Sequence, residues 1–278
     1  MVISFTLFRQ NMTMIIRGRV ELMMREALLK VNQDAGKHLL EPHALEIHEK
    51  SDLFDLVTDM DVRTQEMLRA AYARILPEAA FLGEEDMSDT PAPGQLYWLV
   101  DPIDGTKNFV HGLMHSCLAT ALCKDGEALL ACVYNPWNGE FFFAEKGRGA
   151  TLNGRSIHVS DRGFQDSMVS TGQGYGNRAD TIHRIGPLWQ HCYIHCRGLR
   201  ALGSAELGLC YVAAGRLDGY LEQAIMPWDY LPGNLIIREA GGVATNWKGE
   251  LPSPTGMDSL LAGTPAFHKE MLPLCKDL

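Results

Sequence analysis

The sequence predicts a mixed α/β (α+β) protein made of two packed halves, and three patterns along the chain support this prediction. Two helical segments come first, a run of hairpin signals follows, and from about residue 160 strand-like and helix-like segments alternate. Such alternation is typical of an α/β layer. We therefore expect an N-terminal α+β half at residues 1–160 and a C-terminal α/β half at residues 161–278.

The first half begins with two predicted amphipathic helices. Between residues 13 and 40, apolar side chains such as Leu28 and Val31 recur at helical spacing. The second helix is predicted at residues 62–76. Thr58 and Asp61, just before it, have the spacing of a capping box. A short strand ending at Gly83 and a strand over residues 95–100 come next.

Tight turns then separate a series of alternating segments. The turn dipeptides are Asp125-Gly126, Asn138-Gly139 and Asn153-Gly154. They predict an antiparallel meander in the first half of the chain.

Two motifs of the second half resemble binding sequences. "HCYIHC", residues 191–196, contains zinc-binding residue types but lacks the paired C-x2-C spacing of structural sites. We favour a buried strand there, with zinc as the alternative. "GQGYG", residues 172–176, lacks the G-x-G-x-x-G spacing of a dinucleotide site. Neither motif is assigned a ligand.

Composition limits the classes of partner. The chain has 278 residues, 46% of them hydrophobic, and a net charge of -9, which disfavours broad contact with nucleic acid. No apolar run approaches the roughly 18 residues that a membrane span needs. We find no secretory signal, and the odd number of cysteines, seven, fits reduced thiols. We expect a cytoplasmic protein without a nucleic-acid or membrane partner.

The segment "WLVDPIDGTKNFVHG", residues 98–112, carries the strongest chemical signal. A strand ends at Asp101, where Pro102 should stop the ladder, and Asp104 precedes a turn that opens a short helix. Carboxylates near the start of a helix suit hard divalent ions that bridge to a phosphate. The alternative keeps Asp104 as a turn or cap residue and Asp101 as a solvated strand end.

Two further carboxylates stand at predicted element ends. Glu84 follows an apolar strand within "FLGEED", residues 81–86, and Asp229 precedes an apolar helix, where it could also be a simple N-cap. Mg²⁺ prefers octahedral oxygen ligation, and two such ions about 3.5–4 Å apart can clamp the attacking and leaving oxygens of a phosphate transfer.

Three motifs in order resemble the inositol monophosphatase family, which belongs to the lithium-sensitive, magnesium-dependent phosphatase superfamily. They are "GEE" at 83–85, "DPIDGTKNF" at 101–109 and "WDYLPG" at 228–233. The resemblance covers about residues 21–272. It implies a layered αβαβα sandwich of the sugar-phosphatase type, two or three Mg²⁺ ions and a homodimer. The implied activity is hydrolysis of inositol monophosphate, or a similar polyol phosphate, by metal-activated water.

The resemblance also implies a role for individual residues. First-metal ligands would be Glu84, Asp101 and the carbonyl of Ile103; second-metal ligands would be Asp101, Asp104 and Asp229. Asp61 and Thr106 would help Glu84 to activate water, and the N–H groups of Gly105 and Thr106 would face the phosphate. Ala205 and Glu222 would hold substrate hydroxyls, and Lys50 would lie on a mobile loop near a weaker third ion.

Some positions leave the substrate open. Asn108 resembles the inositol branch, and Glu222 favours a polyol over a second phosphate, whereas Leu231 and Pro232 depart from the usual small residues. The alternatives within the superfamily are phosphatases for 3′-phosphoadenosine 5′-phosphate or fructose 1,6-bisphosphate.

Two readings lie outside this superfamily. "DMDVRT", residues 59–64, superficially matches the D-x-D signature of phosphatases that form an aspartyl-phosphate. The other reading is a regulatory protein that binds RNA or protein and retains a vestigial acidic site.

Overall fold

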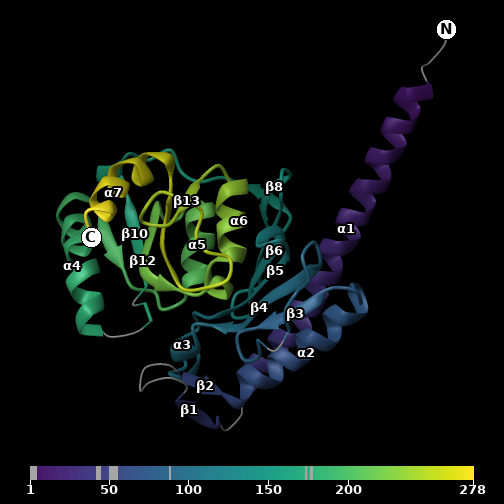
Figure 1. The fold of residues 1–278 in the computed structure, drawn as a ribbon, viewed down its shortest axis with the longest axis horizontal. Coiled ribbons are helices and arrows are strands. Elements are labelled where there is room, and N and C mark those ends of the chain that lie inside the picture. Colours follow the sequence, from purple (N-terminus) through teal and green to yellow (C-terminus); the bar gives the residue numbers. More distant parts are fainter. Residues whose placement is uncertain (1–4, 42–44, 50–55, 88, 173, 176–177) are drawn as a thin grey trace.

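Two β-sheets lie side by side in the molecule, separated and covered by helices (Figure 1). The computed structural model describes residues 5–41, 45–49, 56–87, 89–172, 174–175 and 178–278, and only the backbone for residues 5–22, 49 and 178. No helix within these described residues is long and apolar enough to cross a membrane.

The first sheet has seven strands in the order β3-β4-β5-β6-β7-β8-β9. Their bounds are β3 Ala80–Gly83, β4 Leu96–Asp104, β5 Cys117–Lys124, β6 Glu127–Asn135, β7 Glu140–Glu145, β8 Gly149–Leu152 and β9 Arg155–Ile157. All neighbours pair antiparallel except β3 and β4. This confirms the predicted meander. Both residues of the turns at Asp125-Gly126 and Asn153-Gly154 have the positive φ that tight hairpins require.

The second sheet has five strands in the order β11-β10-β12-β14-β13. Their bounds are β10 Met168–Thr171, β11 Gly198–Arg200, β12 Gly219–Ile225, β13 Val243–Thr245 and β14 Asp258–Gly263. Strand β10 runs parallel to β11 and β12, and β14 runs antiparallel to β12 and β13. The mixed pairing matches the alternation of strands and helices in this part of the sequence.

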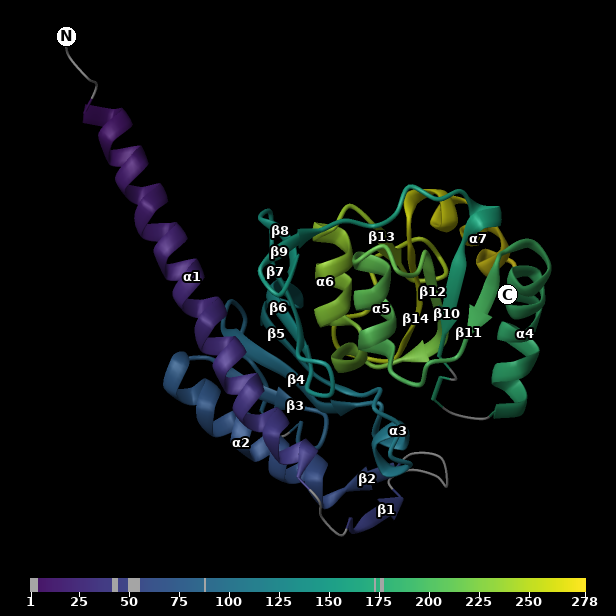
Figure 2. The ribbon, with the colours of Figure 1, turned by 180° about the vertical axis from the view of Figure 1, so that it is seen from behind.

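Helices form the remaining three layers. Figure 2 shows α1 (Phe5–Leu40) and α2 (Asp59–Ile75) on the outer face of the seven-stranded sheet, with the first turns of α1 projecting beyond the body. Helices α5 (Ala205–Ala213) and α6 (Leu231–Glu239) pack between the sheets, and α4 (Arg178–His195) and α7 (Pro265–Lys276) cover the other face of the five-stranded sheet. The predicted αβαβα sandwich is therefore confirmed.

Five short elements complete the described structure. They are the hairpin of β1 (Ile47–Glu49) and β2 (Leu56–Thr58), helix α3 (Thr106–Val110), and the 3₁₀ turns η1 (Phe164–Asp166) and η2 (Pro227–Asp229).

The core explains why the sequence of β4 is a continuous apolar run. Trp98 and Val100 pack toward α1 and α2, where Tyr72 stacks on Trp98 at a centroid distance of 4.6 Å. Tyr97 and Leu99 face the opposite way, into the cluster that contains α5 and α6. Because both faces of the sheet are covered, successive side chains of one strand are all buried.

The two sheets divide between Ile157 and Met168, close to the predicted boundary between the halves. However, one buried cluster contains residues of both sheets. The division into units 1–160 and 161–278 stays a prediction.

Two local predictions were wrong. "HCYIHC" belongs to helix α4 and its end, because Ile185, Leu188 and Cys192 recur every three to four residues and are buried against the five-stranded sheet. Strand β4 also continues through Pro102 as far as Asp104. It does so at an irregularity in its pairing with β5, which is where a sheet tolerates proline.

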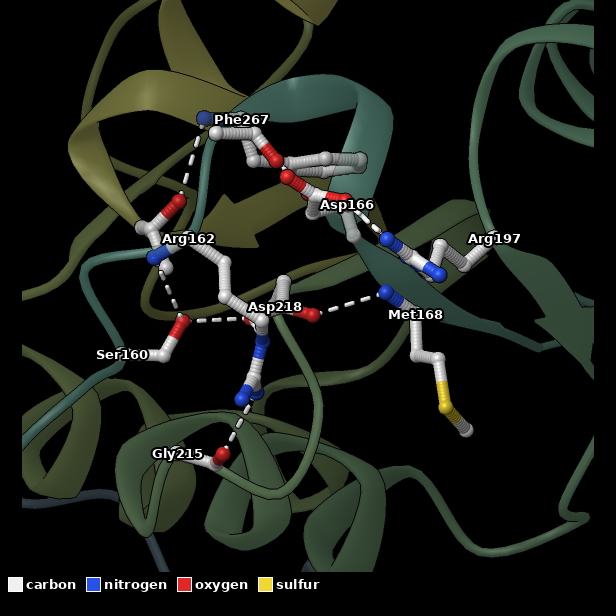
Figure 3. Close-up of polar contacts among 11 residues, drawn as sticks. Ser160, Arg162, Asp166, Met168, Arg197, Gly215, Asp218 and Phe267 are labelled. Atoms are coloured by element: carbon white, nitrogen blue, oxygen red, sulfur yellow. Dashed lines mark hydrogen bonds and ion pairs between the residues drawn. The ribbon is translucent and has the colours of Figure 1, made fainter.

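A buried carboxylate joins the segment between the sheets to the second sheet (Figure 3). Asp218, just before β12, is fully buried and accepts hydrogen bonds from Ser160 Oγ, from Arg162 Nε at 2.8 Å and from the Met168 backbone N–H at 2.7 Å. The three donors lie 50 or more residues away along the chain. Asp218 therefore ties this connection to the start of β10 and β12.

Replacing Asp218 with alanine should lower the free energy of unfolding by about 3 kcal/mol, because a buried N–H and two side-chain donors lose a charged acceptor. Urea denaturation measures this change. Asp166→Ala is the matched control, since Asp166 pairs with Arg197 at an exposed position and such pairs contribute about 1 kcal/mol or less. Equal losses in the two variants would contradict the prediction.

Candidate active site

The candidate site is a cavity of about 490 Å³ where the two sheets approach each other. Glu84, directly after β3, and Asp101, within β4, line it together with Glu222 of β12 and Asp229 of η2. Residues more than 100 positions apart in the sequence therefore share one space.

Three carboxylates meet in this cavity. Glu84, Asp101 and Asp229 each offer one oxygen, and these oxygens all lie within 4.8 Å of one another. Asp101 and Asp229 are buried, with 1% and 7% of their surface exposed, and Glu84 is half-buried. The backbone N–H of Glu84 donates to the carbonyl of Val100 at 3.0 Å, which holds the end of β3 beside β4.

Asp104 lies next to this group but is turned toward helix α5. Its carboxylate accepts hydrogen bonds from Ser204 Oγ and from the backbone N–H groups of Ala205 and Glu206, at 3.1 and 2.9 Å. Asp104 thus binds the free N–H groups at the start of α5, whose N-cap residue is Ser204. Asp104 nevertheless lines the same cavity as the other carboxylates. The alternative reading of a solvated strand end does not hold for Asp101, which is 1% exposed.

Burial and mutual repulsion disfavour the charged forms of these acids. Burial raises the pKa of Asp101 well above its ordinary value, and the neighbouring charges of Glu84 and Asp104 raise it further. The pKa of Asp229 is raised for the same two reasons. Burial raises the pKa of Asp104 to about 6, against the opposing effect of its hydrogen-bond donors. A cation among these carboxylates would remove the repulsion.

The donor set suits a hard divalent ion. Every candidate ligand is oxygen, from Glu84, Asp101, Asp104, Asp229 and the backbone carbonyl of Ile103, which also lies on the cavity wall. Mg²⁺, Mn²⁺ and Ca²⁺ prefer such ligands, whereas zinc favours nitrogen and sulfur. The residues present therefore fit the Mg²⁺ that the sequence motifs imply.

Thr106 and Asp61 form the hydroxyl–carboxylate contact that the resemblance implies. Thr106 Oγ1 lies 3.2 Å from Asp61 Oδ1 and 3.0 Å from the carbonyl oxygen of Ile103. Asp61 Oδ2 accepts from the N–H and hydroxyl of Thr58, both at 2.7 Å, and this arrangement confirms the predicted capping box of α2.

The geometry argues against the aspartyl-phosphate reading of "DMDVRT". Both oxygens of Asp61 accept hydrogen bonds, and Asp59 pairs with Arg63 at 3.2 Å. Neither aspartate is among the residues that line the cavity. An in-line nucleophile would have to face the phosphate.

The predicted substrate contacts Glu222 and Ala205 also line the cavity. Glu222 accepts from the hydroxyl of Tyr220 and from the N–H of Gly174 at 2.7 Å, and burial raises its pKa to about 7. Ala205 lines the wall at the start of α5.

Gly105 also lines the cavity. Gly105 precedes α3 with φ +91°, and a side chain there would meet the Gly203 carbonyl at 3.0 Å. Lys107 lines the cavity, whereas Arg200 is exposed outside it. Lys50 lies outside the described residues.

Sequence reasoning missed two residues of the site. Ser204 contacts Asp104 and caps α5, and its place before an apolar helical run could have revealed it. The hydroxyl of Tyr175 donates to Asp229 Oδ2 at 3.0 Å, and no local pattern signals this contact.

Charge removal should stabilise the metal-free protein. Asp101→Asn keeps the shape of the side chain and an acceptor for the Ile103 N–H, but it removes one of the crowded charges. In EDTA we expect the free energy of unfolding to rise by on the order of 1–2 kcal/mol. Stabilisation by Mg²⁺, about 2.7 kcal/mol at a hundred times Kd for the unchanged protein, should be largely lost.

Thermal unfolding with and without Mg²⁺ measures both effects. Asp161→Asn, at an exposed position, is the control and should change neither value appreciably. A metal-free Asp101→Asn protein that is less stable than the unchanged one would contradict the repulsion argument.

Comparison with known proteins identifies the family. The model of the inositol monophosphatase family matches residues 12–277. The inositol-1-monophosphatase of Rhizobium meliloti is 36% identical over 89% of this chain and 92% of its own, and a Nus factor SuhB of Salmonella typhimurium is 33% identical over 90% and 93%. The structure of a Thermotoga maritima IMPase superposes with a TM-score of 0.81 at 29% identity, covering 94% of this chain and 97% of that one. The chain belongs to the inositol monophosphatase family.

Proposed function

We propose that this protein is a Mg²⁺-dependent phosphomonoesterase that hydrolyses inositol monophosphate or a similar polyol phosphate by attack of water. The observation that carries the proposal is the convergence of Glu84, Asp101 and Asp229, within 4.8 Å of one another, in a cavity that Asp104 and Thr106 also line. Bound Mg²⁺ supplies Lewis-acid stabilisation of the phosphoryl oxygens and lowers the pKa of water.

Different residues would have different roles in the reaction. Glu84, Asp101, Asp104, Asp229 and the Ile103 carbonyl would hold the ions. The Thr106 hydroxyl lies within hydrogen-bond distance of Asp61 Oδ1 and of the Ile103 carbonyl oxygen. If it donates to Asp61, its oxygen would be able to accept a hydrogen bond from the attacking water, while Glu84 would act as the general base that takes the proton.

The reaction needs no covalent intermediate in which a side chain of the protein carries the phosphate. The water oxygen bonds to phosphorus as the ester P–O bond breaks, and Glu84 receives a proton from that water. The leaving alkoxide takes a proton from a second water molecule, whose hydroxide is neutralised by the proton held on Glu84, so that alcohol and inorganic phosphate leave. The N–H groups of Gly105 and Thr106 would orient the phosphate.

The chemistry of the cavity supports a monophosphate with hydroxyl groups. Lys107 is the single cationic side chain among the described residues that line it. A second phosphate normally requires further cationic donors, so bisphosphates are the less supported alternative. Glu222 instead offers carboxylate oxygens to hydroxyl groups. The first relative is named an inositol-1-monophosphatase, which agrees with this substrate class.

The remaining features follow from the family. We expect inhibition by Li⁺, a homodimer and a cytoplasmic location. The name Nus factor SuhB describes another relative, and we do not expect the acidic surface of this chain to serve nucleic-acid binding.

Thr106→Ala should lower kcat by roughly 10²-fold or more, because the attacking water loses a positioned hydrogen-bond acceptor. The assay is phosphate release from inositol 1-phosphate with Mg²⁺, with and without EDTA or Li⁺. Thr151→Ala in β8 is the control, since that hydroxyl contacts only the Phe143 carbonyl in the described structure and lies outside the cavity. No phosphate release by the unchanged protein from any ester of a broad panel would refute the proposed function.

Glu222→Gln should lower kcat/KM for inositol monophosphate by about tenfold, because a charged acceptor for substrate hydroxyls becomes a neutral amide. The rate with p-nitrophenyl phosphate should change much less, since that ester has no hydroxyl group for Glu222 to bind. Parallel kinetics with the two esters measure the difference. An equal loss for both would count against Glu222 as a hydroxyl acceptor.

A further inference from the structure

The segment after β10 runs beside β12 and meets the candidate site at two points. Of residues 172–177, the structure describes Gly172, Gly174 and Tyr175. The Gly172 N–H donates to the carbonyl of Leu221 at 3.3 Å, and the Tyr175 N–H donates to the carbonyl of Ala224 at 3.1 Å. The segment is thus attached to β12 on both sides of Glu222.

The two glycines allow this close approach. A Cβ at Gly172 would lie 2.1 Å from the Glu222 carboxyl group, so any larger residue there would displace this carboxylate. Gly174 has φ +70° and donates its N–H to Glu222 Oε1 at 2.7 Å. The glycines of "GQGYG" therefore bring backbone against a carboxylate, instead of binding a dinucleotide.

Tyr175 extends from this segment to Asp229. Its hydroxyl donates to Asp229 Oδ2 at 3.0 Å, and the backbone N–H of Met226 donates to the same oxygen at 3.2 Å. Within the described part of the chain, these two bonds both go to Oδ2. They constrain the rotation of the carboxylate, and no hydrogen bond among the described residues goes to Oδ1.

We propose that Tyr175 is a positioning residue for Asp229, whose hydroxyl holds Oδ2 so that Oδ1 faces the metal ion. The same segment binds Glu222 through Gly174 and so keeps the hydroxyl acceptor and the metal ligand in a constant relative position. Only the consequence for catalysis rests on the proposed function, because orientation of a metal ligand affects ion binding with or without a substrate.

The expected size of the effect follows from other metal sites. Hydrogen bonds to metal ligands fix their orientation, and their removal typically costs 10–100-fold in metal affinity or activity. Tyr175→Phe removes the hydroxyl and keeps the ring, which is half-buried on the cavity wall.

The test measures Mn²⁺ binding to the full-length, metal-free chain. Titration calorimetry and the electron paramagnetic resonance signal of free Mn²⁺ both give the Kd. Tyr175→Phe should raise the Kd about tenfold. Tyr134→Phe is the matched control, because it removes a tyrosine hydroxyl from β6 on the side facing α1 and α2. Its Kd should equal that of the unchanged protein, and circular dichroism verifies that both variants are folded.

Kinetics provide a second measurement that a purely structural role would not reproduce. The Mg²⁺ concentration for half-maximal phosphate release should rise in Tyr175→Phe, whereas the rate at saturating Mg²⁺ should recover toward that of the unchanged protein.

The outcomes separate the two proposals. Equal Mn²⁺ affinity of the unchanged protein and Tyr175→Phe overturns the role of Tyr175, even if both hydrolyse esters. Weaker binding by Tyr175→Phe supports that role, even if neither protein releases phosphate, in which case the proposed function is what fails.

Discussion

The arrangement of the molecule depends on bringing like charges together in a buried place. Glu84, Asp101 and Asp229 repel one another, and burial opposes the ionisation of two of them. Such a group is unfavourable unless a cation compensates it or the surrounding fold holds it in place. In this protein the fold does hold it, since β3, β4 and η2 are each anchored in a sheet or against the central helices.

Hydrogen bonds from both neighbouring and distant residues orient several of the acids. Asp104 is bound by the start of α5, Asp61 by Thr58 and Thr106, and Asp229 by Tyr175 and Met226. Most of these donors are backbone N–H groups or hydroxyls. They stabilise carboxylates without adding the positive side chains that would compete with a metal ion for the same oxygens.

The buried Asp218 serves a comparable purpose away from the site. It binds the segment that leads from the first sheet to the second, and it lies at the start of β12, the strand that carries Glu222. The connection between the halves is therefore held by directed hydrogen bonds as well as by the shared apolar cluster between the sheets. The position of Glu222 relative to the carboxylates of β4 depends on both.

Much of the fold was predictable from local patterns, and the failures have identifiable causes. Turn dipeptides and the Thr58–Asp61 capping box depend on neighbouring residues alone, so their predictions were correct. "HCYIHC" failed because a six-residue window cannot separate alternation from the three-to-four-residue period that begins at Ile185. The prediction that Pro102 ends the strand was wrong because β4 accommodates this proline at an irregularity in its pairing with β5, which the local sequence does not reveal.

The sequence by itself determined the composition of the site: acidic residues at the ends of apolar segments, in motifs that resemble one family. Only the tertiary structure decided which oxygens face one another. It showed Asp104 bound to the start of α5, and it placed Tyr175 on Asp229, 54 residues away. The physical reason is that element ends and motifs are local properties of the chain, whereas the direction of a buried carboxylate depends on donors supplied by other segments.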